Sequence, residues 1–248
     1  MGHRFFASPD QITPPTVTLS DEESHHLTRV LRIGPGAKVR VFDGVGREYE
    51  CEVQVASRSA ATLAIVSEVT GPVESQLRLT LGQALIKNDK FDWVVQKATE
   101  LGVNRIVPLI TAHSEVVLSE QRGDKRVKRW ERIALEALKQ CGRRRLVEIA
   151  VPVKWEAYCR ADANQVRLLL SEHGGISLKS AARNISSRLE SISIATGPEG
   201  GWDKDEVDVG LNLGQTAVLL GPRILRAETA AVAGVTMVQY LFGDLSTE

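Results

Sequence analysis

Short apolar runs in the second half of the chain constrain the fold most strongly. Residues 166–171, 191–196 and 216–220 form three such runs, in which charged and apolar residues show little alternation. Strands of this kind are buried on both faces, because helices cover both sides of a parallel sheet. The runs therefore predict a sheet that lies inside its domain.

Strands alternate with helices from residue 77 onward. An apolar stripe at helical spacing extends from Phe91 to Leu101, and Gly102 follows it as a stop signal. This alternation is typical of a mostly parallel α/β domain. The other expected elements are strands at residues 77–85 and 105–110 and helices at residues 130–141 and 229–242.

The first third of the chain follows a different pattern. A short helix is expected at residues 21–31, with Ser20 as its N-cap and Glu23 reaching back to complete a capping box. Closely spaced β-rich runs with glycine turns between them then indicate a small barrel or sandwich. The expected strands are residues 38–43, 47–55 and 61–68.

A short linker separates these two patterns. Residues 70–75 combine Gly, Pro, Thr and Ser between the last β-rich run and the first strand of the α/β pattern. We therefore expect two domains, a β-rich domain at residues 1–72 and an α/β domain at residues 73–248.

Composition excludes several classes of protein. The chain has three widely spaced cysteines, which argues against a disulfide framework or a metal knot. No apolar run approaches the roughly 18–20 residues of a membrane helix, and the N-terminus lacks a secretory signal pattern. We expect a cytoplasmic protein with no membrane segment and no metal.

The charge is balanced overall but clustered locally. Lys and Arg number 31, as do Asp and Glu, yet residues 121–145 hold ten basic and three acidic side chains. A solvated helix face explains such a cluster as well as a phosphate-binding patch does.

Two glycine-containing loops each follow a predicted buried strand. The first has the sequence GPEGG at residues 197–201, and the second has LGPRILRAETA at residues 220–230. Ligands of open α/β sheets bind beyond the carboxyl ends of the strands, where glycine lets the backbone approach them. Two tight turns with a helix cap, Asp203 with Glu206, are the alternative interpretation.

Familiar catalytic motifs are missing from the sequence. There is no GxxxxGK[ST] phosphate loop, no GxGxxG after a strand, no HExxH and no GxSxG elbow. An NTP site, a dinucleotide site of Rossmann type, a zinc protease and an α/β-hydrolase are therefore disfavoured.

The two loops together resemble the signature of the ribosomal RNA small subunit methyltransferase E family, which belongs to the SPOUT superfamily. The resemblance extends in order over nearly the whole chain. Its further motifs are Arg4–Phe6, His26–Arg32, Gln96–Val103, Arg129–Trp130, Glu136–Ala137 and Gln140–Arg143.

This resemblance implies a fold and an activity. Such enzymes use S-adenosylmethionine to methylate N3 of one uridine in the 16S ribosomal RNA of the small subunit. They combine an N-terminal PUA-like β-barrel domain with a C-terminal SPOUT α/β domain that contains a trefoil knot, and they work as homodimers. A non-catalytic RNA-binding or ribosome-assembly protein, or a knotted methyltransferase acting on another RNA nucleotide, is the alternative function.

The resemblance also implies a cofactor site. The loop backbone would bind the adenine by main-chain hydrogen bonds, and leucine and isoleucine side chains would cover its faces. The candidate cofactor-binding residues are Leu170, Thr196, Gly197, Pro198, Glu199, Gly200, Gly201, Leu219, Leu220, Gly221, Ile224, Leu225 and Arg226.

Methylation at N3 requires the uracil to lose a proton, so it needs a proton acceptor and stabilisation of the uracil anion. Arg226 is the candidate stabiliser, and Glu199 or Glu228 is the candidate for proton acceptance or polar positioning. Loop bracing explains Glu199 equally well, and a helix-dipole role explains Glu228. Trp202 is a candidate for holding the uracil, with core packing as the favoured alternative.

Basic side chains of the first domain and of the arginine run at residues 143–145 would bind RNA phosphates. Such contacts position the RNA without specifying its sequence. These candidates are Arg4, Arg29, Arg32, Lys38, Arg143, Arg144 and Arg145.

Overall fold

The chain divides into two compact units in the computed structural model. The model describes residues 2–71, 74–114, 120–183, 185 and 189–246. The first unit contains Met1–Glu74 and Leu138–Leu146, and the second contains Ser75–Ala137 and Val147–Glu248. The expected boundary after residue 72 lies close to this division, but the assignment of Leu138–Leu146 to the first unit was not expected.

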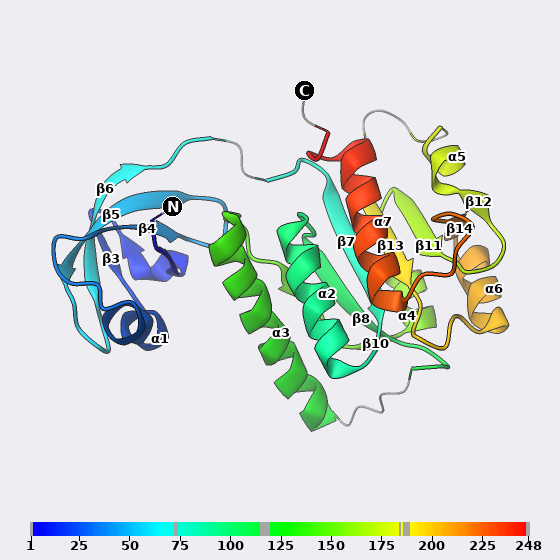
Figure 1. Cartoon of the computed structure of the whole chain (residues 1–248), viewed down its shortest axis with the longest axis horizontal. Coiled ribbons are helices and arrows are strands. Elements are labelled where there is room, and N and C mark those ends of the chain that lie inside the picture. Colours follow the sequence, from blue (N-terminus) through cyan, green and yellow to red (C-terminus); the bar gives the residue numbers. More distant parts are fainter. Residues whose placement is uncertain (1, 72–73, 115–119, 184, 186–188, 247–248) are drawn as a thin grey trace. The chain divides into compact units, whose positions relative to one another are not determined.

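The first unit is built on a six-stranded sheet with the order β1-β4-β5-β6-β3-β2, of which Figure 1 labels β3, β4, β5 and β6. β1 pairs with β4 in parallel, and the other pairs are antiparallel. Side chains such as Phe5, Val41 and Leu63 are fully buried between the sheet and the helix that follows Ser20. The strands are β1 (Arg4–Phe6), β2 (Ile12–Thr13), β3 (Thr16–Thr18), β4 (Lys38–Phe42), β5 (Glu48–Val55) and β6 (Thr62–Glu68). The three predicted strands are thus confirmed, whereas the very short β2 and β3 were not predicted.

The predicted helix at residues 21–31 is also present, but its second half is wider than an α-helix. α1 (Asp21–His25) continues as a π-helical turn, η2 (His26–Val30), and a 3₁₀ turn, η1 (Pro9–Gln11), precedes both. The Ser20 hydroxyl accepts a hydrogen bond from the Glu23 amide at 3.3 Å, as expected of an N-cap.

The other half of the predicted capping box is wrong. The Glu23 carboxylate is buried, where it accepts hydrogen bonds from the Lys139 ammonium and from the Phe6 amide. A buried carboxylate is stable only when a cation or several donors compensate its lost hydration. The long-range pairing with Lys139 therefore takes the side chain away from the helix N-terminus.

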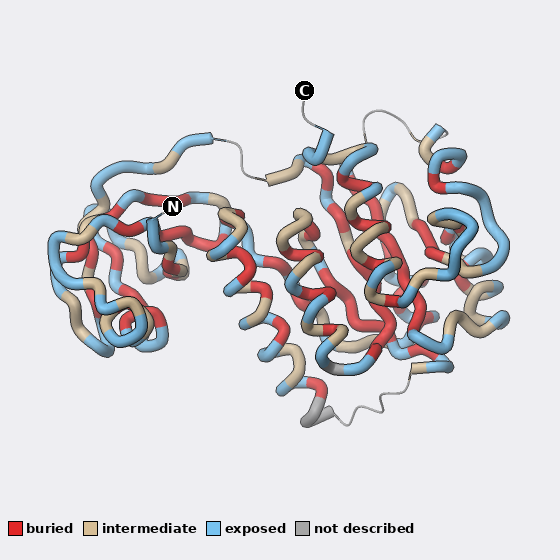
Figure 2. Tube along the Cα trace, viewed as in Figure 1, coloured by how far each residue is buried: buried red, intermediate tan, exposed pale blue. Residues whose placement is uncertain are grey.

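The second unit is built on a sheet of eight parallel strands, as the sequence predicts. The order is β10-β8-β7-β13-β11-β14-β12, with β9 also paired to β8. All six residues of β13 are buried, and Figure 2 shows buried strands through this sheet. The strands are β7 (Arg78–Ala84), β8 (Arg105–Ile110), β9 (Glu148–Ile149), β10 (Val153–Lys154), β11 (Val166–Leu170), β12 (Ile176–Ser177), β13 (Ser191–Thr196) and β14 (Thr216–Leu219).

Helices cover both faces of this sheet. α2, α3, α5 and α7 contribute to one apolar core, and α4 and α6 contribute to a second core on the other face. Figure 1 shows α2 and α7 side by side over the sheet. The bounds are α2 (Asn88–Glu100), α3 (Glu120–Cys141), α4 (Trp155–Ala161), α5 (Leu178–Arg183), α6 (Lys204–Asn212) and α7 (Ala227–Phe242). None of the helices in the described ranges is both long and apolar enough to span a bilayer.

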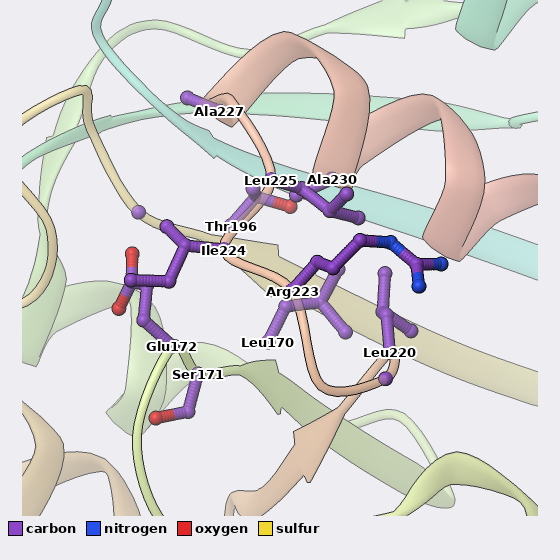
Figure 3. Close-up of a pocket in the computed structure, with 12 residues that line it drawn as sticks. Leu170, Ser171, Glu172, Thr196, Leu220, Arg223, Ile224, Leu225, Ala227 and Ala230 are labelled. Carbon is purple, nitrogen blue, oxygen red and sulfur yellow. The ribbon is translucent and has the colours of Figure 1, made fainter.

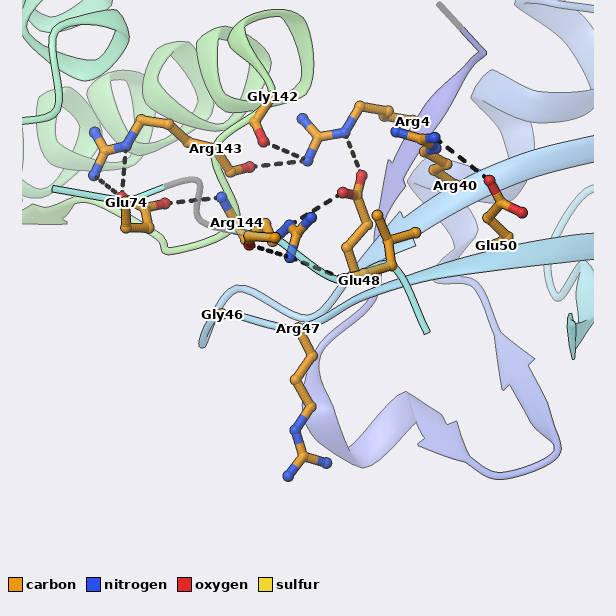
Figure 4. Close-up of polar contacts among 12 residues, drawn as sticks. Arg4, Arg40, Gly46, Arg47, Glu48, Glu50, Glu74, Gly142, Arg143 and Arg144 are labelled. Carbon is orange, nitrogen blue, oxygen red and sulfur yellow. Dashed lines mark hydrogen bonds and ion pairs between the residues drawn. The ribbon is translucent and has the colours of Figure 1, made fainter. Parts of the chain in front are cut away.

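A network of buried ion pairs ties Leu138–Leu146 into the first unit (Figure 4). The Glu48 carboxylate accepts hydrogen bonds from Arg4 Nε at 2.7 Å and from Arg144 Nε at 3.1 Å. The Arg4 guanidinium also donates to the carbonyl oxygens of Leu138 and Gly142, at 2.7 and 3.1 Å. A cation at this position interacts favourably with the carbonyl groups at the C-terminal end of α3 and with the helix dipole.

Replacement of Glu48 by Ala tests this network. The variant leaves two buried guanidinium groups without their carboxylate, so we expect a loss of about 3–5 kcal/mol in the free energy of unfolding. Glu50→Ala is the matched control, because the Glu50 side chain is 51% exposed where that of Glu48 is 4% exposed. The control should lose less than about 1 kcal/mol in urea titration. Equal losses for the two variants would contradict the structural role of Glu48.

Candidate active site

The carboxyl ends of three neighbouring strands form one wall of a narrow cavity (Figure 3). Leu170 ends β11, Thr196 ends β13, and Leu220 follows β14. β11 pairs with β13 on one side and with β14 on the other, so the two glycine-containing loops emerge on either side of it. The sheet topology thus brings together two loops that are separate in the sequence.

The wall of the narrow cavity combines apolar side chains with polar groups. The Thr196 hydroxyl is buried and has no hydrogen-bond partner among the described residues. Buried hydroxyls are nearly always paired in native proteins, so a lone one in a cavity wall fits a ligand with a hydrogen-bonding group. The residues that line the cavity are Leu170, Ser171, Glu172, Thr196, Gly197, Leu220, Gly221, Arg223, Ile224, Leu225, Ala227 and Ala230.

Glycine is required at two of these positions for different reasons. Gly221 has a φ of 134°, which other residues rarely adopt, although a side chain there would meet open space. A Cβ atom at Gly197 would lie 3.0 Å from the Trp202 Nε1 atom. The first glycine thus permits the backbone turn, and the second permits the close approach of the indole ring.

Trp202 holds the first loop against the sheet. Its indole nitrogen donates a hydrogen bond to the Leu170 carbonyl oxygen at 2.9 Å, and its ring packs on Trp155 with centroids 4.6 Å apart. The next residue, Asp203, caps α6 and forms the predicted capping box with Glu206. Trp202 therefore packs as a structural residue, in agreement with the favoured alternative.

A second, larger cavity of about 520 Å³ shares part of its wall with the first. Glu172, Ile224, Leu225 and Ala227 line both cavities. The remaining residues that line the larger cavity are Lys87, Lys90, His173, Pro198, Glu199, Gly200, Gly201, Trp202 and Arg226. The narrow space and the wide, more highly charged space can thus receive two different chemical groups side by side.

Lys90 contacts both candidate proton acceptors, Glu199 and Glu228. Its ammonium group donates a hydrogen bond to Glu199 and lies 3.5 Å from Glu228 Oε1. The hydrogen bond to Glu199 raises the pKa of Lys90 above its ordinary value, so the side chain is a cation at neutral pH. Glu228 lies in the first turn of α7, which is also where a helix-dipole role would place it.

The structure brings most of the candidate cofactor residues to one of the two cavities. Leu170, Thr196, Gly197, Leu220, Gly221, Ile224 and Leu225 line the narrow one, and Pro198, Glu199, Gly200, Gly201 and Arg226 line the larger one. Leu219 lies in β14 and lines neither cavity in the described part of the chain. Sequence reasoning missed Lys87, Lys90, Glu172 and His173, which follow no motif that singles them out. Arg223 lies in the second loop but was not among the candidate cofactor-binding residues.

The candidate RNA-binding cations fall into two groups. Arg4, Arg143 and Arg144 are buried in ion pairs with Glu48 or Glu74, so the expectation that they contact phosphates is wrong. Their guanidinium groups instead compensate buried carboxylates inside the first unit. The exposed candidates are Arg29, Arg32, Lys38 and Arg145. Within the described ranges, no three His, Cys, Asp or Glu side chains gather as metal ligands.

Comparisons with known proteins agree with this geometry. A family model described as an RNA methyltransferase domain matches residues 73–239, and one described as an RNA methyltransferase PUA domain matches residues 19–66. A Synechocystis protein named ribosomal RNA small subunit methyltransferase E is 33% identical over 97% of this chain and 78% of its own length. A Buchnera aphidicola protein of the same name is 30% identical over 91% of this chain and 88% of its own.

Solved structures that resemble this chain are also methyltransferases. A Legionella pneumophila methyltransferase in complex with bound S-adenosylmethionine has a TM-score of 0.91 and 29% identity, with 99% of this chain and 100% of that chain covered. A ribosomal RNA small subunit methyltransferase E from Neisseria gonorrhoeae, bound to S-adenosylmethionine, has a TM-score of 0.90 and 32% identity over the same shares. The chain therefore belongs to the RNA methyltransferase family whose members include the ribosomal RNA small subunit methyltransferases E.

Proposed function

We propose that this protein transfers a methyl group from S-adenosylmethionine to N3 of a uridine in the 16S ribosomal RNA of the small subunit. The observation that carries the proposal is the pair of adjoining cavities at the carboxyl ends of β11, β13 and β14. The narrow one combines apolar side chains with polar groups, and the larger one is lined by several charged side chains. The relatives named above support the choice of donor and of RNA.

The narrow cavity is the proposed donor site. Leu170, Leu220 and Ile224 offer apolar contacts to an adenine ring, and the Thr196 hydroxyl offers a hydrogen bond that no described protein group uses. When bound, S-adenosylmethionine supplies an electrophilic methyl group on a sulfonium. The residues of the site hold this donor and orient it toward the larger cavity.

The larger cavity is the proposed site of the target uracil. The Arg226 guanidinium would stabilise the negative charge that spreads over the uracil when N3 loses its proton. Glu199 lies on the same wall and would accept that proton or orient the base, with Glu228 as the alternative group. The uracil has to leave its base stack to reach this cavity.

We also propose the finer features of the fold. The sheet of the first unit would close as a PUA-like barrel, which the match at residues 19–66 supports. The second unit would carry a trefoil knot around the two loops, which the insertion of β11 between β13 and β14 supports. A ribosomal substrate would place the protein in the cytoplasm.

Small ribosomal subunits from cells that lack the protein are the substrate of choice for the test. Incubation with S-adenosylmethionine and the protein should produce N3-methyluridine in the 16S RNA, measured by nucleoside mass spectrometry. A 2′-O-methyl or carbon-methylated nucleoside would instead indicate a methyltransferase that acts on another position. Failure of the donor to bind in calorimetry would leave a non-catalytic RNA-binding or ribosome-assembly protein.

A pair of threonine variants tests the binding of the donor in the narrow cavity. Thr196→Val keeps the shape of the side chain and removes its unpaired hydroxyl, so donor affinity should fall about 2–10-fold, as expected for one hydrogen bond. Thr236→Val removes a hydroxyl that already bonds to the Val232 carbonyl oxygen within α7, and donor affinity should stay unchanged.

The exposed cations of the first unit are the proposed RNA contacts. Charge reversal of Arg32 and Arg145 together should weaken RNA binding and reduce the slope of log affinity against log salt by about 1 for each lost phosphate contact. Arg160→Glu is the control, because Arg160 is also exposed but pairs with Glu156 on α4. A salt slope that stays the same in the double variant would refute these contacts.

A second copy of the chain is the proposed partner of α7. Met237, Tyr240 and Leu241 are large apolar side chains at helical spacing, and all are exposed on α7, with Tyr240 at 61%. Such a stripe is typical of a face that another subunit covers. We expect a homodimer in sedimentation velocity, shifted toward monomer by Tyr240→Glu. A monomer at all micromolar concentrations of the unmodified protein would contradict the dimer.

A further inference from the structure

The Lys90 side chain connects α2 with both glycine-containing loops. The side chain extends from the first turn of α2 and contacts two carboxylates. Glu199 belongs to the loop after β13, and Glu228 is the second residue of α7, directly after the loop that follows β14. One cation thus connects three elements that are distant in the sequence.

The three charged groups are partly shielded from water. The side chains of Lys90, Glu199 and Glu228 are all less than one quarter exposed. Glu228 Oε2 is buried and has no hydrogen-bond partner among the described residues, so the contact of Oε1 with Lys90 is the main compensation for this carboxylate. Partial shielding strengthens the attraction of the ammonium group for both carboxylates compared with a fully exposed pair.

Lys90 also stands at the boundary between two surface depressions. It lines the larger cavity together with Glu199 and Arg226, and it lines a groove of about 330 Å³ together with Asp89, Trp93 and Glu228. It does not line the narrow cavity in the described part of the chain. Its influence should therefore be greatest on the proposed nucleotide site and smaller on the donor site.

We propose that Lys90 is a positioning residue for the methyl transfer, which holds Glu199 at the wall of the larger cavity and keeps the start of α7 beside it. The inference rests on the proposed function. The Lys90 ammonium group neutralises part of the repulsion between Glu199 and Glu228, and this allows both loops to approach α2 at the same time. Arg226, which directly precedes α7, is placed by the same contact.

Removal of the Lys90 ammonium group should lower the rate of methyl transfer more than it weakens donor binding. Lys90→Gln frees two neighbouring carboxylates, and their repulsion should displace Glu199 and the start of α7. A displacement of about 1 Å can cost about 100-fold in rate, so we expect a fall in kcat of that order. The KM for S-adenosylmethionine should change less than about threefold.

The pH dependence provides a readout that simple loss of packing would not change. Loss of one positive charge beside the larger cavity should move the acidic limb of the pH–rate profile to higher pH. The variant does not alter the identity of the other charged groups that face the cluster. They are Lys87, Glu172, His173 and Arg226 in the larger cavity and Asp89 in the groove.

Two further variants control for folding and for loss of charge on α2. Lys90→Arg keeps the cation and should retain most of kcat and the original pH profile. Lys97→Gln removes a lysine that pairs with Glu100 on the same helix, away from both cavities, and should leave kcat unchanged. Melting temperatures of all three variants should stay within a few degrees of the unmodified protein, because the affected side chains are partly exposed.

Hydrogen–deuterium exchange separates this inference from the proposed function, because it needs no RNA and no methyl transfer. Lys90→Gln should increase amide exchange in residues 198–201 and 226–228 together, whereas Lys90→Arg and Lys97→Gln should not. Increased exchange without any N3-methyluridine from the unmodified protein would refute the proposed function alone. Unchanged exchange, or a Lys90→Gln enzyme with normal kcat and pH profile, would overturn the role of Lys90.

Discussion

The parallel arrangement of buried strands is the constraint on which the candidate site depends. In a parallel sheet all carboxyl ends lie at one edge, so every loop that follows a strand starts there. Insertion of β11 between β13 and β14 then places the GPEGG loop and the LGPRILR loop on either side of one strand. Two adjoining cavities result, and neither loop could form them alone.

Features that depend on neighbours in the sequence could be predicted. β13 and β14 contain no charged residue, and the turn at Asp203 has its capping partner three residues away, at Glu206. The positions of the two loops at the ends of buried strands follow from the same local information. The sequence therefore indicated that these loops line a cavity, although Arg223, Ala227 and Ala230 were not among the candidates.

Features that depend on distant partners could not be predicted. Lys90 is 109 residues from Glu199, and nothing in the local sequence distinguishes it from the other lysines of its region. The same limit applies to Arg144, which belongs to a run of three arginines that resembles a phosphate-binding patch. Its buried partner, Glu48, lies 96 residues away, so composition alone could not separate a structural cation from an exposed one.

The central claim is that the narrow cavity beside Thr196 binds the methyl donor and the larger cavity receives the acceptor. A crystal structure of the protein with S-adenosylmethionine tests this claim most directly. The donor should lie against Leu170, Thr196 and Leu220, with its methyl group directed toward the space lined by Glu199 and Arg226. Donor density at any other place on the chain, or a methyl group directed away from that space, would contradict the account.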